Sequence, residues 1–589
     1  MILRELYNYY ERMSAGDDSP MPKLYWSRER VGWEFEIDRE GNLLSVLPSI
    51  PAGSGAGKNK SFTEMFVPEH DLRSSGIKPF FLCDKASYFL GLDDKRGNEL
   101  LASACDLHEK VLSDCEDDGA QAVISFFRKE HLSDMKTEEV EALKTGSFIV
   151  FFLEDEGYIH DRPAIKQAWR RYREQALGGE IGQCLVTGEQ QPLARLFPQI
   201  SGFPGAQSAG ASLVSFNKES FEAYGKEQGQ NAPVAEKVAF GSSMALGYLL
   251  KDPAHHCRIG DSVVVFWSDQ YAPREEMFIK EAIDPEIPHG VPSPEDEQLV
   301  KEIKASLTQM SRGKKPEGFD ANVRFFVLGL APNAARLSVR FFETSSFGDL
   351  EKNLGAYFED TALGKYPVRG LRSYLNQTAP RGASSKVPSS LVCSATRAML
   401  TGSPFPWGLY SALLLRMRTD RGTINQWDMP IRASMFKAFL VRQARFTTNT
   451  KKQALGRSLT MGLNECNTHT GYLLGRLFAL LEKAQRDAQP NINKTIRDRY
   501  MASASTTPAR VFPLLMRLSN YHISKAEYGG YIDSLIRKLC VLMDDENPFP
   551  KTLSYEEQGL FYVAYQQQKD DLYEPKDKNA EPVNELVAE

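Results

Sequence analysis

The spacing of apolar residues predicts a short helix followed by strands at the start of the chain. Apolar side chains within residues 2–10 recur at the three- and four-residue intervals of one helix face. Three runs rich in aromatic and β-branched residues follow, at 24–26, 31–37 and 43–47. The polar residues 38–42 between the last two runs predict a hairpin turn. The N-terminal region is therefore expected to begin as an antiparallel sheet.

Helical and strand patterns alternate up to about residue 345. The predicted elements are helical residues 98–147, strands 148–153 and 262–267, and a hairpin of 323–330 with 337–342 around Pro332-Asn333. A polar, proline-containing stretch from Asp284 to Glu297 is typical of an insertion or surface loop, because strand-forming sequence resumes after it. This mixture predicts an α+β region.

Beyond Gly348 the pattern changes to long helical segments with few β-branched runs. Apolar spacing predicts amphipathic helices at 470–488, 508–518 and 531–543. The last two dozen residues are charged and poor in apolar groups, which predicts a disordered tail. The expected fold class is α+β, with an N-terminal mixed α/β region containing antiparallel sheet and a C-terminal all-α helical bundle region.

The length of 589 residues exceeds what one hydrophobic core usually supports. We predict three domains, at 1–345, 346–460 and 461–589. Apolar residues at 42% and charged residues at 25% are typical of folded globular proteins. The sequence has no run of about 18 apolar residues and no basic-then-apolar leader. These features predict a soluble, cytoplasmic protein without membrane association.

A local excess of positive charge contrasts with the net charge of -6 for the whole chain. Between Arg416 and Arg457, ten basic residues stand against two acidic ones, Asp420 and Asp428. The ten are Arg416, Arg418, Arg421, Arg432, Lys437, Arg442, Arg445, Lys451, Lys452 and Arg457. Such a stretch suits contact with a nucleic-acid backbone, because binding depends on where charges lie. The alternative is a solvated helix face whose charge is cancelled by acidic residues folded nearby.

A glycine-rich segment at 52–60 resembles a phosphate-binding P-loop but departs from the pattern at two positions. Position 52 is alanine instead of glycine, and position 59 is asparagine instead of a hydroxyl residue that would hold magnesium. What remains is a flexible backbone with polar and charged groups at its tip. We interpret it as a candidate DNA contact, with a plain mobile loop as the alternative. Its candidate residues are Gly53, Gly55, Gly57, Lys58, Asn59 and Lys60.

The segment 73–79 places cations and hydroxyls just before an apolar run. Arg73, Ser74 and Lys78 carry groups that commonly donate hydrogen bonds to phosphate oxygens. We predict that they contact DNA phosphates. The alternative is a salt bridge from this segment to Asp71 or Asp84.

Residues 212–234 carry many amides and hydroxyls but no acid-base or metal-ligand set. The preceding glycine-rich run, 202–211, is unsuited to a helix interior, so the two segments predict a shaped loop platform. Four amides, of Asn217, Gln228, Gln230 and Asn231, are candidates for hydrogen bonds to base edges. The alternative is that these amides cap helices or close turns.

Candidates for catalysis are sparse. The pairs His70-Asp71 and His160-Asp161 and the triplet 255–257 would need further ligands to form a metal-dependent nuclease. No H-E-x-x-H, paired C-x-x-C or G-x-S-x-G motif occurs, and the eight cysteines show no metal-ligand spacing. We predict no catalytic residue, no metal and no cofactor. A nuclease using the His-Asp pairs remains an alternative.

Four stretches of the sequence resemble one protein family. They are Gln183-Cys184-Leu185-Val186-Thr187-Gly188 through Asn231-Ala232-Pro233, Arg73 to Pro79 with Leu82 and Asp84, Val323 to Asn333 with Val339-Arg340-Phe341, and Tyr472 to Phe478. The family is the large subunit of the type I-C CRISPR interference complex, Cascade, an RNA-guided DNA-binding machine. The four stretches occur in order along nearly the whole chain.

The resemblance implies a subunit that recognises a protospacer-adjacent motif in double-stranded DNA and helps to start strand separation. It implies as partners crRNA, the target double-stranded DNA, the backbone, crRNA-end-capping and small subunits, and a recruited helicase-nuclease. It also implies that the part from Met461 onward resembles a separately made small subunit. The first domain would recognise the motif, and the second would contact a DNA strand. A structural assembly subunit that does not read the motif is a further alternative.

Overall fold

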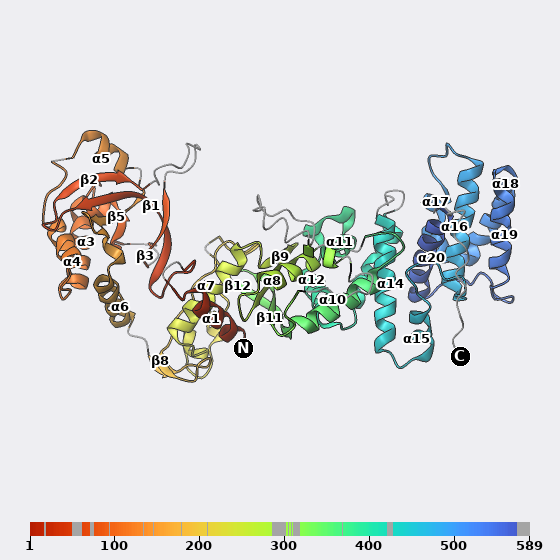
Figure 1. Ribbon diagram of the computed structural model, residues 1–589, viewed down its shortest axis with the longest axis horizontal. Helices are drawn as coiled ribbons and strands as arrows, with labels where there is room; N and C mark the ends of the chain where they lie inside the picture. The colour runs from red at the N-terminus through yellow and green to blue at the C-terminus, as the bar shows by residue number, and fades with distance from the viewer. Residues whose placement is uncertain are drawn as a thin grey trace. The chain divides into compact units, whose positions relative to one another are not determined.

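The computed structural model describes the chain in two compact units (Figure 1). It describes residues 1–573 apart from 17–18, 50–61, 71–72, 74–75, 94, 134, 145, 178–179, 209, 285–301, 304, 308, 310–317, 368 and 421–427. The first unit comprises Met1–Ile200 and Ser212–Tyr248, and the second comprises Ser201–Ala211 and the chain from Leu249 onward. These units do not coincide with the ranges 1–345, 346–460 and 461–589, whose assignment as functional domains remains a prediction.

The first unit begins with the predicted helix and strands. Its elements are α1 Ile2–Met13, β1 Trp26–Ile37, β2 Leu43–Pro48, β3 Thr63–Pro68, β4 Cys83–Lys85, α2 Ala86–Phe89, α3 Gly97–Leu112, α4 Asp118–Phe127, α5 Thr137–Leu143, β5 Phe148–Leu153, β6 Gly157–Tyr158, η1 Ile159–Asp161, α6 Pro163–Leu177, β7 Ile181–Gln183, β8 Gln190–Pro192, η2 Glu219–Phe221, η3 Gln228–Asn231 and α7 Glu236–Lys251, whose last residues belong to the second unit.

The main sheet of the first unit is built around β1. Strand β1 pairs antiparallel with β2 and β3 and parallel with β5, which also pairs antiparallel with β4 and β6. The predicted hairpin turn at 38–42 is confirmed, and Gly41 there has a φ of +80°. A Cβ at Gly41 would lie 2.5 Å from the backbone nitrogen of Phe126, so a side chain would clash with α4. Of the predicted strand 24–26 only Trp26 belongs to β1, which continues without a break into the predicted strand 31–37 because β3 pairs along the linking residues. The prediction is wrong for Leu24 and Tyr25, which lie in a turn where Tyr25 has a φ of +68°.

Aromatic side chains join this sheet to its helices. Phe35 of β1, Phe126 of α4 and Phe151 of β5 are fully buried, with ring centroids 5.1–6.1 Å apart. The predicted helical stretch 98–147 consists of three helices, α3, α4 and α5, separated by short breaks. Burial of such rings stabilises the unit through a large apolar area.

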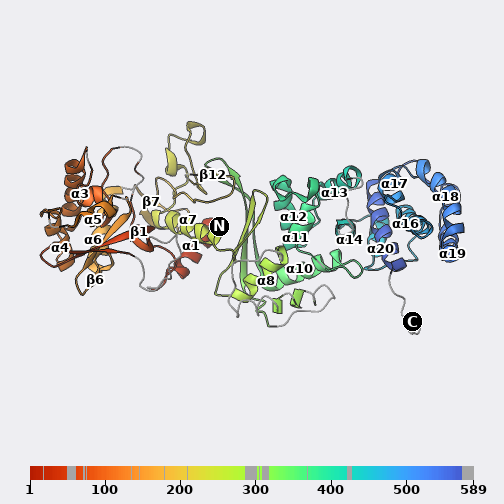
Figure 2. The same ribbon diagram turned by 90° about the horizontal axis from the view of Figure 1, so that it is seen from above.

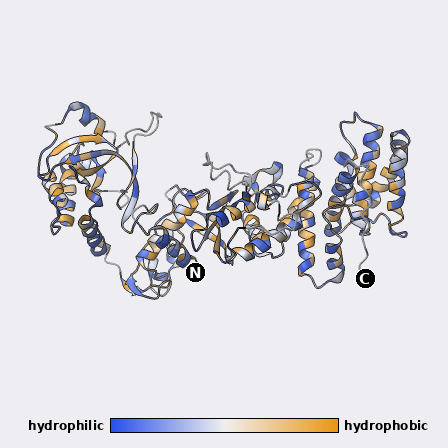
Figure 3. Ribbon diagram, in the orientation of Figure 1, coloured by the Kyte–Doolittle hydropathy of each residue, from blue (hydrophilic) through white to orange (hydrophobic). Residues whose placement is uncertain are grey.

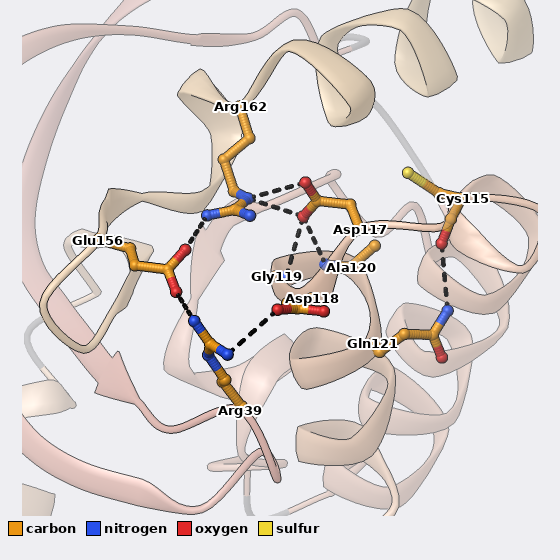
Figure 4. A network of polar contacts seen from close by, with 9 residues as sticks. All are labelled: Arg39, Cys115, Asp117, Asp118, Gly119, Ala120, Gln121, Glu156 and Arg162. Carbon is orange, nitrogen blue, oxygen red and sulfur yellow. Dashed lines mark hydrogen bonds and ion pairs between the residues drawn. The ribbon is translucent and has the colours of Figure 1, made fainter.

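A network of charged side chains ties the hairpin turn to the start of α4 (Figure 4). Asp117 caps α4 by accepting hydrogen bonds from the backbone of Gly119 and Ala120, at 2.9 and 3.3 Å. Its carboxylate also accepts from Nε of Arg162 at 2.7 Å, and Arg162 reaches Glu156 at 2.6 Å. Glu156 in turn binds Arg39 of the turn. The carboxylates therefore hold both guanidinium groups in place.

The second unit contains an antiparallel sheet and most of the helices. Its elements are β9 His256–Ile259, β10 Ser262–Ser268, α8 Pro273–Ile283, β11 Arg324–Asn333, β12 Arg336–Ser346, α10 Phe347–Thr361, α11 Leu371–Asn376, η4 Pro380–Gly382, η5 Ser384–Lys386, α12 Ser389–Thr401, α13 Trp407–Thr419, α14 Asp428–Phe446, α15 Thr450–Arg457, α16 Thr470–Ala488, α17 Ile496–Ala504, α18 Pro508–Lys525, α19 Gly529–Cys540 and α20 Tyr555–Tyr573.

The four-stranded sheet of this unit has the order β12-β11-β10-β9. The predicted hairpin of β11 and β12 is confirmed, although pairing continues through Pro332 and Asn333 and the turn lies two residues later. A Cβ at Gly329 of β11 would lie 2.2 Å from the ring of Phe341 on β12, so the glycine makes room for that ring. One continuous core runs from Cys257 of β9 to Tyr565 of α20.

The stretch Tyr472–Phe478 lies where α16 packs against α20, which lie side by side in both views (Figures 1 and 2). A Cβ at Gly475 would lie 2.2 Å from the carbonyl oxygen of Phe561, so glycine allows the two backbones to approach. The hydroxyl of Tyr472 donates to Gln567 at 2.7 Å, and Nε of Arg476 donates to Gln568 at 2.9 Å. This stretch therefore fixes helix packing.

The predicted fold class, α+β with a helical C-terminal part, is confirmed. Helix α16 has the predicted bounds, and α18 and α19 overlap the predicted helices. Hydrophobic and hydrophilic positions alternate along these helices (Figure 3), as expected for helices that bury one face. Among the described residues, no helix is both long and apolar enough to cross a membrane. The predicted disordered tail lies outside the described residues from 574 onward, but the prediction is wrong up to Tyr573, because these residues form the end of α20.

Candidate nucleic-acid interface

The glycine-rich loop lies outside the residues that the structure describes. The candidates concerned are Gly53, Gly55, Gly57, Lys58, Asn59 and Lys60, and Ser74 lies outside as well. Strand β2 ends before the loop and strand β3 begins after it, and both strands pair with β1. The loop therefore connects two strands that flank β1, and its contact with DNA remains a prediction.

Arg73 is engaged within the protein. Its guanidinium forms an ion pair with Asp84, a residue of β4 whose side chain is fully buried. Its Nε donates to the backbone carbonyl of Lys78 at 2.7 Å. The guanidinium also lies 3.5 Å from the ring centroid of Phe80 and 4.0 Å from that of Tyr88. These contacts favour the alternative reading, a structural salt bridge.

Asp84 explains why this ion pair forms. Burial raises the pKa of the Asp84 carboxyl, and hydrogen bonds from Arg73 and from the backbone of Phe80 and Lys85 oppose that rise. A buried carboxylate needs such partners. Lys78, by contrast, is exposed, so it is the described residue of this segment that can reach a phosphate.

Three of the four amides predicted to read base edges form hydrogen bonds within the protein. Asn231 accepts a hydrogen bond from the backbone of Ala223 at 3.0 Å and donates to the carbonyl of Lys226 at 2.8 Å. Gln228 accepts from Nε of Arg195 at 2.7 Å. Gln230 accepts from the backbone of Glu227 and donates to Glu180, at 3.0 and 2.9 Å. Three of the four amides are thus engaged within the protein: Asn231 and Gln230 help to close the loop, the alternative stated for them, and Gln228 binds Arg195 outside it.

The surface of this loop is formed by other residues. Asn217 is exposed, and so are Lys218 and Lys226. Tyr224 is 99% exposed, the highest value among the large hydrophobic residues found exposed in the described chain. Prediction from the sequence selected the amides of this segment and missed this tyrosine. The signal present in the sequence was an aromatic residue between Ala223 and Gly225 in an otherwise polar run.

Acidic residues neutralise part of the basic stretch 416–457. Asp420 pairs with Arg416 at 3.2 Å and with Arg432 at 2.8 Å. Arg418 donates to the side chain of Gln558 at 2.7 Å. The folded stretch therefore presents less positive charge than its sequence contains.

Asp360 of α10 neutralises another part of the stretch. Nε of Arg442 lies 2.9 Å from one carboxylate oxygen, and Arg445 binds both oxygens, at 3.0 and 2.6 Å. Arg442 is 0% exposed, so the prediction that it contacts DNA is wrong: a fully buried guanidinium cannot reach a phosphate. Arg445 keeps 43% of its side chain exposed.

Lys437 lies close to the same carboxylate. Its Nζ donates to the backbone carbonyls of Glu359 and Asp360, at 3.1 and 3.0 Å. Burial lowers the pKa of Lys437 to about 8, and the charge of Asp360 limits the fall. This lysine belongs to the interior of the unit.

The exposed cations of the stretch gather on α15. Lys451, Lys452 and Arg457 are all exposed, and Lys452 also pairs with Glu556 at 2.5 Å. Arg421 lies outside the described residues. Helix α15 is therefore the described part of the stretch that is best suited to contact a nucleic-acid backbone.

Neutralising α15 should change the salt dependence of DNA binding by the assembled complex. If Lys451, Lys452 and Arg457 contact phosphates, replacing all three by glutamine should reduce the slope of log affinity against log salt by roughly two to three units. A matched control variant replaces three other exposed lysines of the same unit by glutamine: Lys352, Lys365 and Lys386. It should leave the slope nearly unchanged, because the slope counts phosphate contacts. Equal slopes for both variants would assign α15 to a protein partner.

The His-Asp pairs do not assemble a metal site in the described chain. His70 stacks on Phe80, with ring centroids 4.0 Å apart, and lies 3.5 Å from Glu29. His160 is buried beside Trp26 and Tyr158, and burial lowers its pKa to about 4. Among the described residues, no group of three or more His, Cys, Asp or Glu side chains could hold a metal ion. Asp71 lies outside those residues.

Comparison with known families identifies the class of this protein. The family described as CRISPR-associated protein (Cas_Csd1) matches residues 6–573. This is a CRISPR-associated protein, a component of a Cascade-type complex. The chain belongs to the Cas_Csd1 family, the large subunit of the type I-C complex. No match is found among curated proteins.

Proposed function

We propose that this large subunit recognises the protospacer-adjacent motif in double-stranded DNA and helps to open the duplex for pairing with crRNA. The family match over residues 6–573 is the observation that carries this proposal. In RNA-guided effectors, guide pairing reads most of the sequence, whereas protein contacts to a short motif and local destabilisation of the duplex start the hybrid. The subunit then contributes binding free energy and no covalent chemistry of its own.

Described residues of both units support a division of labour. Lys78 and the loop around Asn217 are exposed on the first unit, and α15 exposes cations on the second. We assign the first group, with the loop 53–60, to the motif and its flanking phosphates. We assign α15 to the displaced strand or the duplex, where charge without base contacts is sufficient. Backbone, crRNA-end-capping and small subunits, crRNA and a recruited helicase-nuclease complete the proposed set of partners.

The part from Met461 onward is proposed to correspond to a separately made small subunit. It contains α16 to α20. In the full chain it packs against preceding helices: the ring of Tyr562 stacks on Phe436 at 5.6 Å, and Tyr410 donates to the carbonyl of Tyr555 at 2.8 Å. A separate copy would therefore present this aromatic surface to another partner.

The motif-recognition proposal is tested by removing the two lysines of the glycine-rich loop. The double variant Lys58→Ala and Lys60→Ala should weaken binding of the assembled complex to target duplex on the order of 10-fold, because two candidate phosphate or groove contacts are lost. Binding is measured by titration with a duplex that carries the motif and one in which the motif is altered.

The matched control is Lys95→Ala with Lys144→Ala, two exposed lysines of the same unit. This control removes the same charge and should leave the affinity within twofold of the parent complex. Unchanged affinity and unchanged motif preference in the Lys58 and Lys60 variant would remove the loop from the proposed interface.

A further inference from the structure

The loop 217–231 of the first unit presents one aromatic side chain to solvent. Tyr224 is 99% exposed, so its ring is not held by burial against the rest of the unit. Its neighbours Ala223 and Gly225 carry no bulky side chain that would cover the ring. An aromatic ring with both faces accessible is uncommon for a residue whose apolar area favours burial.

The backbone at the tip of this loop adopts left-handed conformations that are unfavourable for non-glycine residues. Tyr224 has a φ of +55° and Gln228 a φ of +43°, both in the left-handed region that non-glycine residues rarely occupy. Gly225, between them, has a φ of +67°. Such conformations persist where the surrounding contacts impose them, and they are often found at functional sites.

The hydrogen bonds that close the tip of the loop come from the side chains of Asn231 and Glu222. Asn231 bridges Ala223, Lys226 and Gln228 through three hydrogen bonds of 2.8–3.1 Å. The backbone nitrogen of Gln228 donates to Glu222 at 3.0 Å. These bonds join residues on both sides of Tyr224, so the tip is a closed and fastened turn.

The base of the loop is fixed to the neighbouring segment. The backbone nitrogen of Gly229 donates to the carbonyl of Arg195 at 3.0 Å. A Cβ at Gly229 would lie 2.1 Å from the carbonyl oxygen of Ala194, so the two segments are in close backbone contact. The ring of Tyr224 is thus presented by a closed turn whose C-terminal side is anchored to the neighbouring segment.

The charges of the loop argue for stacking over attraction to phosphates. Lys218 and Lys226 are exposed, but Glu219 and Glu227 are exposed beside them. The local charge is therefore nearly balanced, and the loop lacks the basic field of a backbone-binding surface. A single accessible aromatic ring is suited to stacking on a nucleobase.

We propose that Tyr224 stacks on a nucleobase that is released when the duplex opens beside the recognised motif. The proposal rests on the function proposed above and names a residue that performs part of it. In an intact duplex both faces of an internal base are covered by its neighbours, so the ring can stack only where a base step has opened. Stacking would therefore stabilise the opened state and leave binding to the closed duplex unchanged.

The variants used in the test distinguish the effect of losing the ring from the effect of changing the loop conformation. Tyr224→Gly removes the ring and accepts a positive φ without strain, so the subunit should be at least as resistant to thermal unfolding as the parent. Tyr224→Phe keeps the stacking surface. Tyr271→Ala removes another tyrosine, 89% exposed, as the matched control. All three are assembled into the complete complex with crRNA, and duplex opening is measured by permanganate reactivity of thymines next to the motif.

Tyr224→Gly should reduce the ratio of opened to closed target by roughly 5-fold to 150-fold, the range for loss of one aromatic stack on a base. Tyr224→Phe and Tyr271→Ala should open DNA like the parent. A set of targets with a single abasic position, moved stepwise away from the motif, completes the test. At one position the parent and the Tyr224→Gly complexes should open the abasic target equally, because the partner base is gone.

The outcomes distinguish this inference from the proposed function. A complex lacking the subunit that binds and opens motif-bearing DNA as well as the complete complex would overturn both. Normal opening by Tyr224→Gly in a subunit-dependent complex would overturn the stacking role alone. Loss of partner subunits from the Tyr224→Gly complex would show that the ring docks onto protein, and it would also overturn the stacking role.

Discussion

Replacing Asp360 by asparagine should lower the free energy of unfolding of the second unit by about 3 to 5 kcal/mol. Asp360 is the carboxylate partner of Arg442, whose side chain is fully buried. Nη1 of Arg442 also donates to the carbonyl of Ala398 at 3.1 Å, and its guanidinium lies 4.6 Å from the ring centroid of Phe405. Without the carboxylate, the guanidinium keeps its charge in a place where water cannot solvate it.

The neighbouring Lys437 should respond to the same change. Burial already lowers its pKa to about 8, and the negative charge of Asp360 opposes that fall. In the asparagine variant the pKa of Lys437 should decrease further, so this lysine can relieve its burial by losing a proton. Arg442 cannot do this, because arginine remains protonated in proteins. The loss of stability is therefore assigned mainly to Arg442.

The loss in free energy of unfolding is measured by chemical denaturation of the full chain. Hydrogen exchange of the amides in α10 and α14 is the readout for the second unit. Arg445→Ala is the control, because Arg445 binds the same carboxylate but is 43% exposed. It should cost no more than about 1 kcal/mol. The double variant Asp360→Leu with Arg442→Met should recover most of the lost stability, since apolar residues can replace a buried ion pair. Equal losses for Arg445→Ala and Asp360→Asn would contradict this account.

The first unit should lose stability on the order of 4 kcal/mol between pH 7 and pH 5 through two buried histidines. Burial lowers the pKa of His108 and of His160 to about 4, below the ordinary value of 6.5. Between these two values the unfolded chain binds more protons than the folded chain. The stability contributed by the neutral imidazoles is thus complete above about pH 6.5 and is lost as the pH falls toward 4.

The hydrogen bonds of His108 agree with a neutral ring. Its Nε2 accepts a hydrogen bond from the backbone of Leu82 at 3.0 Å, and its Nδ1 lies 2.7 Å from the carbonyl oxygen of Ala104. Protonation at Nε2 would remove the acceptor for Leu82. The ring is also packed among Phe81, Phe89 and Phe127, which leaves no solvent to stabilise a charge.

Hydrogen exchange in α3 and β5, measured from pH 7 to pH 5, reports on the first unit. Burial raises the pKa of Glu29, Asp84 and Glu236, which acts in the opposite direction, so the histidine contribution is taken from variants. His108→Gln with His160→Gln should flatten the pH dependence of exchange. His255→Gln, in the second unit, should leave it unchanged. A pH dependence unaltered by the double variant would refute the assignment.

Patterns of apolar and polar residues were sufficient to predict a helix or strand wherever residues close in sequence determine the structure. The apolar run 148–153 forms β5 with the predicted bounds, and helix α16 spans the predicted residues 470–488. In both cases the periodicity of apolar positions agrees with the face that the fold buries. The α+β class and the order of its parts follow from the same signal.

Tertiary contacts decided which polar residues remain available to bind a partner. The excess of positive charge at 416–457 was visible in the sequence, but Asp360, 82 residues before Arg442, neutralises part of it only after folding. In the same way Asp84 engages Arg73, and the amide of Asn231 turns inward while Tyr224 points to solvent. A sequence determines which groups a chain carries and its local periodicity. Burial and pairing of those groups depend on residues distant in the chain, and only the folded structure brings them together.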